Sequence, residues 1–542
     1  MLVAILGLAL FATGYFFYAR FIEKKVWQVD FSKKTPAVIK DDGLDYVPAK
    51  HWTVLFGHHF ASIAGAGPII GPVIACSLFG WGPALLWIIV GSIFIGGVHD
   101  FSALMLSLRH HGATVGHVAE SVLSRRSRLV FSSFLWLALI LVVAVFAAIT
   151  AKTMVAEPRI VIPSFGIIFI AVLFGLMIYR WQVNQWQATL VALAMIGYLI
   201  YLGLQYPITL DLPNALNLWI VILLAYAYIA SILPVNFLLQ PRDYLSAFIL
   251  FFGLALGYLG IFVSTPKMNA PMFISHQSSQ GPLWPMMFVI IACGAISGFH
   301  SLISSGTTSK QLPRKRAAKR VTFGGMILEG VLSLLAIIAV CAGLQWVGGT
   351  PGLVYPELMK ESGWIVTFGK GFGQLVAPLI GSTLGALIAM FTLNAFVLTT
   401  LDSATRITRY ITEEMFGDAL GIKLLKNKYL STLLIVLLAF WLAMGSWTAL
   451  WPVFGASNQL IAAMVLLLAS VYLFQKRQPS LYTFIPAIFM TITTIGALIY
   501  EMFIFFQKNN FLLFTIAAIL LVLAGDMLIE AFRVINKDNK GG

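Results

Sequence analysis

Long apolar runs alternate with short polar stretches along the whole chain. About fifteen runs have the roughly 20 residues that an α-helix needs to cross a bilayer. The pattern therefore predicts an all-α polytopic membrane protein of about 15 transmembrane helices. The predicted spans are 2–22, 52–77, 82–107, 129–151, 160–179, 186–204, 217–239, 244–264, 284–305, 321–346, 373–400, 429–446, 448–474, 484–506 and 511–532.

The composition agrees with a chain that is nearly all membrane. Of the 542 residues, 59% are hydrophobic and only 10% are charged, whereas a soluble domain carries roughly 25% charged residues. The net charge is +14, but the basic residues lie in short loops between apolar runs. The expected partner is therefore the lipid bilayer, and binding of nucleic acid is not expected. A P-loop and a soluble catalytic domain are both absent from the sequence, which predicts that the protein is not an enzyme.

Positive charge also predicts the orientation. When the loops are numbered by the span they follow, 28 of the 35 Lys and Arg fall in the odd loops and the C-terminal tail. Because Lys and Arg accumulate on the cytoplasmic side, the N-terminus is expected outside and the C-terminus inside. The first run begins at Met1 without a basic stretch before it, which favours a retained span over a cleaved signal.

Two of the runs are interrupted by residues that break helices. The run 52–77 contains Gly65, Gly67 and Pro68. It carries the pattern G-x-H-x5-G, which recurs at 298–306, at the end of the run 284–305. The two runs point in opposite directions, and paired interrupted spans in inverted halves indicate the midplane site of a transporter. The alternative is that these glycines only allow close helix packing.

Freed N–H groups at such breaks favour a carboxylate. We expect the substrate carboxylate near Gly65–Gly67 and Ser304–Thr308, with two histidines beside it, while His58 is a structural neighbour. The predicted substrate-binding residues are His59, Gly65, Ala66, Gly67, His300, Ser304, Ser305, Thr307 and Thr308.

Ionisable residues within apolar runs are candidates for ion coupling, because a charge at the bilayer centre is costly. Histidine and carboxylate side chains can carry protons, and hydroxyls can bind a hard cation. The predicted coupling residues are His99, Asp100, Glu329, Thr399, Thr400, Asp402 and Ser403. The alternatives are neutral histidines bonded between helices and a salt bridge from Asp402 to Arg406. Glu501 and Asp526 are expected to reach water at span ends.

No cofactor or metal is predicted, apart from H⁺ or Na⁺ as the coupling ion. The three cysteines have no metal-like spacing. A rival hypothesis from another class is a metal or haem protein whose ligands are His58, His59, His99 and His300. A nutrient sensor without transport is a further alternative.

Several stretches are similar to the carbon starvation protein A (CstA) family of bacterial transporters. They are DGLDYVPAKHWTVLFGHHFASIAGAGPIIGPV, GGVHDFSALMLSLRHHG, QPRDYLSAFIL, CGAISGFHSLISSGTTSKQ, LTTLDSATRITRYI and FGASNQLIAAM, between residues 42 and 464. The resemblance implies an uptake carrier for peptides or pyruvate, driven by protons or another ion, in the bacterial cytoplasmic (inner) membrane during carbon starvation.

The resemblance also implies kinship with the amino acid–polyamine–organocation superfamily. Its core is a leucine-transporter-like, five-plus-five inverted repeat with interrupted first and sixth helices. The whole chain, 1–542, would then be a single transporter domain. Its expected parts are an N-terminal helix and loop (1–51), a first repeat (52–204), intervening helices (217–264), a second repeat (284–474) and C-terminal helices (484–542). The choice between peptide and pyruvate, the coupling ion and the oligomeric state stay open at this point.

Overall fold

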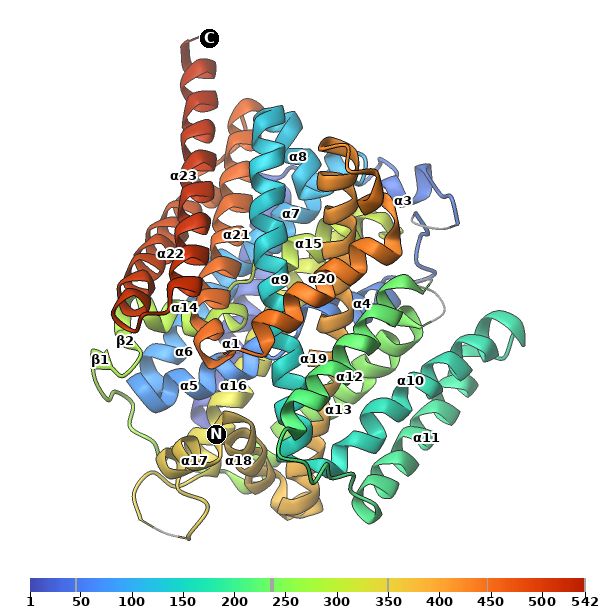
Figure 1. Ribbon diagram of the computed structural model, residues 1–542, viewed down its shortest axis with the longest axis vertical. Helices are drawn as coiled ribbons and strands as arrows, with labels where there is room; N and C mark the ends of the chain where they lie inside the picture. The colour runs from blue at the N-terminus through green and yellow to red at the C-terminus, as the bar shows by residue number, and fades with distance from the viewer. Residues whose placement is uncertain (44–45, 234–237, 349, 446, 541–542) are drawn as a thin grey trace.

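The computed structural model describes residues 1–43, 46–233, 238–348, 350–445 and 447–540, and it is almost entirely helical (Figure 1). Within these residues, thirteen helices are long and apolar enough to cross a membrane, or fourteen when one bent pair counts as a span. The all-α polytopic fold is thus confirmed, and the number fifteen stays a prediction. The ends of the predicted spans 217–239 and 429–446 reach residues outside the described ranges.

The helices follow the apolar runs closely. The long helices are α1 (Leu2–Thr13), α4 (Trp52–Ile63), α5 (Gly67–Phe79), α6 (Trp81–Val90), α7 (Gly97–Arg109), α9 (Arg125–Ala156), α10 (Val161–Gly175), α11 (Gln185–Gln205), α12 (Ala215–Ile232), α13 (Leu239–Ser264), α16 (Ala318–Gly343), α18 (Gly363–Ile380), α19 (Ser382–Thr412), α20 (Lys428–Ala443), α21 (Trp447–Gln475), α22 (Leu481–Gln507) and α23 (Phe511–Lys540). The short elements are α2 (Ala19–Phe21), α3 (Pro36–Ile39), α8 (Val115–Val122), α14 (Phe288–Ile291), α15 (Phe299–Gly306), α17 (Tyr355–Glu361) and the paired strands β1 (Gln277–Ser278) and β2 (Gly281–Pro282).

One predicted span is wrong. The run 373–400 is not a single helix, because α18 ends at Ile380 and α19 begins at Ser382. Gly381, with a φ of +81°, makes the turn, since glycine adopts this left-handed backbone without strain. The two helices fold back on each other, so that Gly373 meets Ser382 and Ala386. Hydropathy stays high through the turn and therefore conceals it.

Both interrupted runs are broken helices. Residues 64–66 separate α4 from α5, with a bend of 44°, and residues 292–298 separate α14 from α15. The first half of each broken helix packs beside the second half of the other, α4 beside α15 and α5 beside α14. The two broken helices are therefore antiparallel, as an inverted pair requires.

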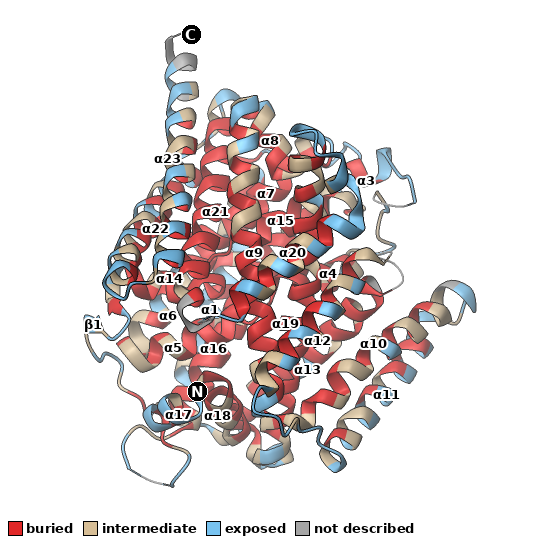
Figure 2. Cartoon of the chain, in the orientation of Figure 1, coloured by how far each residue is buried: buried red, intermediate tan, exposed pale blue. Residues whose placement is uncertain are grey.

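Burial separates a core from a periphery. Figure 2 shows the helices α9, α16, α19 and α21 largely buried. The apolar segment of α21 is 94% buried, whereas that of α11 is 28% buried. Large apolar side chains are exposed on the outer helices, for example Phe169 on α10, Trp186 on α11 and Val522 on α23. Exposed apolar surface of this kind suits contact with lipid tails.

The packing favours a different division into repeats from the predicted one. The hairpin α10–α11 lies at the edge of the molecule (Figure 1). In contrast, α12 packs against α9, α19 and α20, and α13 packs against α4 and α19. The repeat boundaries stay a prediction. We propose that α10 and α11 are the inserted pair and that α12 and α13 complete the first repeat.

Candidate functional site

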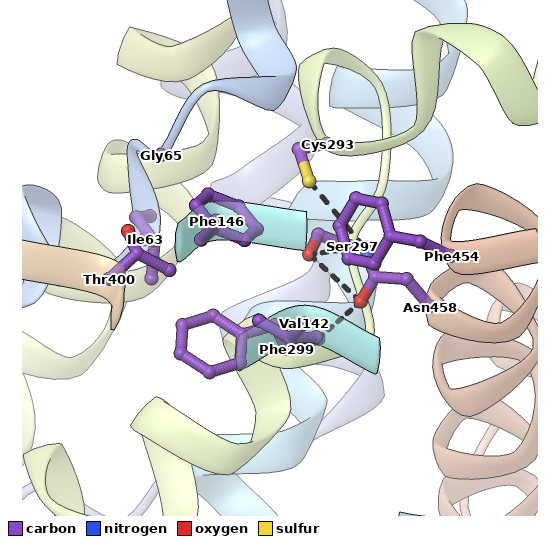
Figure 3. A pocket seen from close by; sticks show the side chains of 10 residues that line it. All are labelled: Ile63, Gly65, Val142, Phe146, Cys293, Ser297, Phe299, Thr400, Phe454 and Asn458. Carbon is purple, nitrogen blue, oxygen red and sulfur yellow. Dashed lines mark hydrogen bonds between the residues drawn. The ribbon is translucent and has the colours of Figure 1, made fainter. Parts of the chain in front are cut away.

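A small cavity lies where the two helix breaks meet (Figure 3). It is walled by both breaks and by the long helices α9, α19 and α21. Its volume is about 10 Å³, which is room for one water molecule. The structure therefore shows this site closed, and a substrate can enter only if the helices move apart. The lining residues are Ile63, Gly65, Val142, Phe146, Cys293, Ser297, Phe299, Thr400, Phe454 and Asn458.

Asn458 of α21 holds the second break together. Its Oδ1 accepts the N–H of Phe299 at 2.9 Å, and its carbonyl oxygen accepts the N–H of Gly298 at 3.0 Å. Its Nδ2 donates to the Ser297 hydroxyl at 3.0 Å and to Cys293 Sγ at 3.4 Å (Figure 3). Asn458 thus caps the N-terminus of α15 from another helix, and it satisfies donors that the break leaves free.

The first break brings the predicted residues Gly65, Ala66 and Gly67 to the site. Gly65 lines the cavity, Ala66 is buried, and Gly67 is the first residue of α5. A Cβ on Gly65 would lie 3.1 Å from Thr400 Oγ1 of α19. In the described part of the chain the Thr400 hydroxyl has no hydrogen-bond partner. Thr400 is therefore a buried polar group that faces the cavity.

The other predicted substrate residues lie elsewhere. Ser304 and Ser305 are inside α15, and Thr307 and Thr308 follow its end. None of the four lines the cavity, because the second break lies at 292–298 rather than near Gly306. Their role in binding stays a prediction, and the cavity residues from this segment are Cys293, Ser297 and Phe299.

The two histidines of the repeated pattern are not structural equivalents. His59 lies in α4, before its break, and His300 lies in α15, after its break. His59 Nδ1 is 2.8 Å from Thr308 Oγ1, and neither histidine lines the cavity. The pattern G-x-H-x5-G therefore does not mark corresponding positions of two inverted halves.

His300 instead joins a buried cluster with predicted coupling residues. Asp100 of α7 contacts two imidazoles, His99 Nδ1 and His300 Nδ1, each at 2.8 Å. The other ring nitrogen of His300 is 3.1 Å from Glu329 Oε2 of α16. All four side chains are fully buried. We call these residues, His99, Asp100, His300 and Glu329, the acid–histidine cluster.

The acid–histidine cluster brings two groups that can each carry a proton, the His300 ring and the Glu329 carboxyl, within 3.1 Å of each other. A neutral imidazole has one N–H, and His300 uses Nδ1 toward Asp100. Its Nε2 then faces a Glu329 carboxyl whose oxygens have no hydrogen bond within the described residues. A proton on Nε2, which gives an imidazolium, or a proton on Glu329 makes this contact attractive. Either group can therefore hold one exchangeable proton.

Asp402 belongs to a second buried network. It pairs with Arg242 of α13 and accepts a hydrogen bond from Tyr226 of α12 at 2.8 Å. Arg242 also contacts Asp243 at 3.3 Å, and Asp243 contacts His58 of α4 at 3.1 Å. This network, which we call the arginine network, links α4, α12, α13 and α19. Asp402 thus already has a fixed cation beside it.

The structure changes several expectations about residues near the inner ends of the spans and at Glu501. Asp402 is not paired with Arg406, because Arg406 donates to the carbonyls of Ala230 and Leu233. Thr399 donates a hydrogen bond within its own helix, to Ala395 O. Of the predicted oxygen ligands, Thr400 lines the cavity, whereas Thr399 and Ser403 do not. Glu501 does not reach water, since it is 3% exposed.

Sequence reasoning missed most of the cavity-lining residues, among them Asn458, and it also missed Tyr226, Arg242 and Asp243 of the arginine network. Arg242 resembles a loop charge in the sequence, although the structure places it inside α13 and 1% exposed. The available signal for Arg242 and Asp243 was a charged pair in the very short stretch, 240–243, between the apolar runs 217–239 and 244–264. Asn458 was visible as a polar residue within the apolar run 448–474. Nothing in the sequence distinguished Tyr226 from other tyrosines.

The four histidines of the rival metal hypothesis contact side chains of the protein that lie in different places. His58 faces Asp243, His59 faces Thr308, and His99 and His300 face Asp100. Across the described ranges, no group of three or more His, Cys, Asp or Glu side chains is arranged to hold a metal ion.

The fold and the paired breaks define a multi-pass membrane transporter, and comparison with known proteins agrees. The family model "Carbon starvation protein CstA" matches residues 1–346 and 354–497. The chain belongs to this CstA family.

Three relatives show how far the similarity extends. The peptide transporter CstA of Bacillus subtilis is 32% identical, over 91% of this chain and 88% of the relative. That of Campylobacter jejuni is 30% identical, over 91% and 79%. The pyruvate/proton symporter BtsT of Escherichia coli is 29% identical, over 92% and 81%.

A solved structure supports the fold alone. A mutant form of the manganese transporter from Eremococcus coleocola is superposable with a TM-score of 0.54 at 13% identity, over 91% of this chain and 99% of that one. The sequence relatives described above are named as transporters, which favours transport over catalysis.

Proposed function

We propose that the chain is a proton-coupled secondary transporter that imports a small carboxylate-bearing nutrient, pyruvate or a short peptide. The observation that carries the proposal is the closed cavity between two antiparallel broken helices. Helix N-termini at such breaks attract a carboxylate through free N–H groups and the helix dipole. The names of the relatives include both peptide transporters and a pyruvate/proton symporter, which supports both substrate classes.

The acid–histidine cluster is the proposed proton site. His300 directly follows Phe299, which lines the cavity, so a movement of α15 on substrate binding also moves His300 relative to Asp100 and Glu329. Such a movement changes the affinity of the cluster for its proton. Substrate and proton are thereby coupled through one short helix. Asp402 is a weaker candidate because Arg242 already neutralises it.

Transport would proceed by alternating access. The cavity must open to one side to admit substrate and to the other side to release it. We place the protein in the bacterial cytoplasmic membrane, with the N-terminus outside and the C-terminus inside, on the basis of the loop charges. Carbon starvation would be the condition of use, as the family name suggests.

Uptake into proteoliposomes tests the proposal. Labelled pyruvate and labelled dialanine are each supplied with an imposed pH gradient, with an imposed Na⁺ gradient, and with neither. We expect one of the two substrates to accumulate with the pH gradient and not with the Na⁺ gradient. If neither substrate accumulates under any gradient, the transport proposal fails. If only the Na⁺ gradient drives uptake, the proposed proton coupling fails.

A further inference from the structure

The carboxamide oxygen of Asn458 caps α15 in the way that an oxygen of a bound carboxylate would. Its Oδ1 sits 2.9 Å from the Phe299 nitrogen, at the N-terminus of a helix of eight residues. A substrate carboxylate at this break would need the same N–H group, since the carbonyl oxygen of Asn458 occupies that of Gly298. The carboxamide oxygen and a substrate oxygen therefore compete for one position.

The close approach of Asn458 is built into the backbone. A Cβ on Gly298 would lie 2.2 Å from the Asn458 carbonyl oxygen, so a residue larger than glycine does not fit there. α21 and the second break are thus held together at the cavity wall, independently of the side-chain cap.

A second polar group marks the same cavity as a ligand site. Thr400 is 2% exposed and lines the cavity from α19, and its hydroxyl has no partner among the residues that the structure describes. A buried hydroxyl without a hydrogen bond is costly. A ligand with an acceptor oxygen would remove that cost.

We infer, on the basis of the proposed function, that Asn458 is the residue that recognises the substrate carboxylate. In the closed cavity its Oδ1 takes the place of a carboxylate oxygen on the Phe299 N–H. When substrate binds, its carboxylate replaces Oδ1 there, the carboxamide turns, and Nδ2 donates to the carboxylate. No covalent bond changes in this exchange. Asn458 is well suited to it because one side chain supplies both an acceptor and a donor.

The test is Asn458→Asp, which places a permanent carboxylate where the substrate carboxylate would bind. An aspartate caps a helix N-terminus as well as asparagine does but lacks the Nδ2 donor to Ser297 and Cys293, so the thermal unfolding midpoint is measured beside binding to confirm that the variant is folded. Binding of pyruvate and of dialanine to purified protein is measured for the wild type and the variant. Whichever probe the wild type binds should bind the variant at least about tenfold more weakly, as for a lost hydrogen bond to a charged group.

Two further variants make the result specific. Asn394→Asp is the matched control, because Asn394 is also fully buried but bonds to Ser164, away from the cavity. Its binding should equal that of the wild type. Asn458→Ser keeps a capping oxygen and removes the amide donor, so it should fold and bind weakly.

The outcomes separate this inference from the proposed function. If Asn458→Asp or Asn458→Ser binds the probe with wild-type affinity, the inference is wrong while the transport proposal stands. If the wild type binds and transports neither pyruvate nor dialanine, the proposed function itself fails. Equal loss of binding in Asn394→Asp would also overturn the inference, since buried charge alone would then explain the effect.

Discussion

Glu329 is the side chain on which the proposed proton coupling depends most directly. It faces His300 Nε2 at 3.1 Å, and neither is exposed. Glu329→Gln keeps the shape and a hydrogen-bonding group but cannot gain or lose a proton. With one proton per substrate, a gradient of one pH unit supports accumulation of at most about tenfold. We expect the variant to lose this accumulation and to retain exchange of labelled for unlabelled substrate.

The control for Glu329→Gln is Glu501→Gln. Glu501 is another buried carboxyl, 3% exposed, on the peripheral helix α22. Both variants are assayed for gradient-driven uptake and for exchange in the same proteoliposomes. Unchanged driven uptake in Glu329→Gln would show that the proton is held elsewhere.

The arginine network makes a prediction about stability. Arg242→Met leaves the buried carboxylates of Asp402 and Asp243 without their guanidinium partner. Removing one member of a buried ion pair costs about 3–5 kcal/mol. A comparable loss is expected in the free energy of unfolding of the purified protein. The double variant Arg242→Met with Asp402→Leu should recover part of the loss, because one unpaired charge is removed with it.

An exposed ion pair provides the comparison for Arg242→Met. Arg533 pairs with Glu530 at 3.4 Å, and the arginine side chain is 67% exposed. Arg533→Met should cost less than about 1 kcal/mol. Equal effects of the two arginine variants would contradict the assignment of Arg242 as a buried ion-pair partner.

Individual residues were only partly predictable. Asp100 and Glu329 were found because a charge inside an apolar run is rare and costly. Their partner His300 was also identified, but as a substrate residue, since sequence spacing does not show which face of α15 meets α7. Arg242 was not predicted as a buried residue because it stands at the edge of an apolar run, where the sequence does not distinguish a loop charge from a buried charge.

At the scale of elements, the backbones of the two broken helices approach each other closely at Gly71. A Cβ there would lie 2.6 Å from Ile290 O and from Ile291 Cα, and these backbone atoms cannot move aside by a side-chain rotation. Gly71→Ala should therefore separate α5 from α14 and cost about 1–3 kcal/mol of stability. The midpoint temperature of thermal unfolding and the rate of substrate uptake are both expected to fall.

Gly306→Ala is the matched control for Gly71→Ala. Gly306 ends α15, in the other broken helix, and a Cβ added there would have nothing within 4 Å of it. This variant should unfold and transport as the wild type does. If Gly71→Ala behaves like Gly306→Ala, the two broken helices do not depend on this contact.

The elements themselves were largely predictable, and the exceptions have clear causes. Gly65, Gly67 and Pro68 correctly marked the first break because glycine and proline weaken a helix locally. The second break lies at 292–298 and not near 304–308, where the substrate carboxylate was expected. The sequence has three glycines there, Gly294, Gly298 and Gly306, and does not show at which of them the helix breaks. Its cap, Asn458, is distant in the sequence. The turn at Gly381 was hidden by continuous hydropathy.

At the scale of the whole molecule, helix packing adds what the order of spans does not contain. The count of apolar runs cannot say which helices lie at the centre. The structure shows α12 and α13 against α9, α4 and α19, and α10–α11 at the edge. The two divisions differ only in which pair of helices, α10–α11 or α12–α13, is the inserted one. Both pairs have two helices, so either division leaves every later span in the same orientation. The predicted topology is therefore independent of the division into repeats.

That topology can be tested by labelling single cysteines in intact cells. The loop at Asp211 is predicted outside and the segment at Lys423 inside, and both positions are exposed. The three native cysteines, Cys76, Cys293 and Cys341, are buried, so background labelling should be low. A membrane-impermeant maleimide should label Asp211→Cys in intact cells and Lys423→Cys only after permeabilisation. The reverse pattern would invert the orientation that the positive charges predict, and with it the side from which substrate enters.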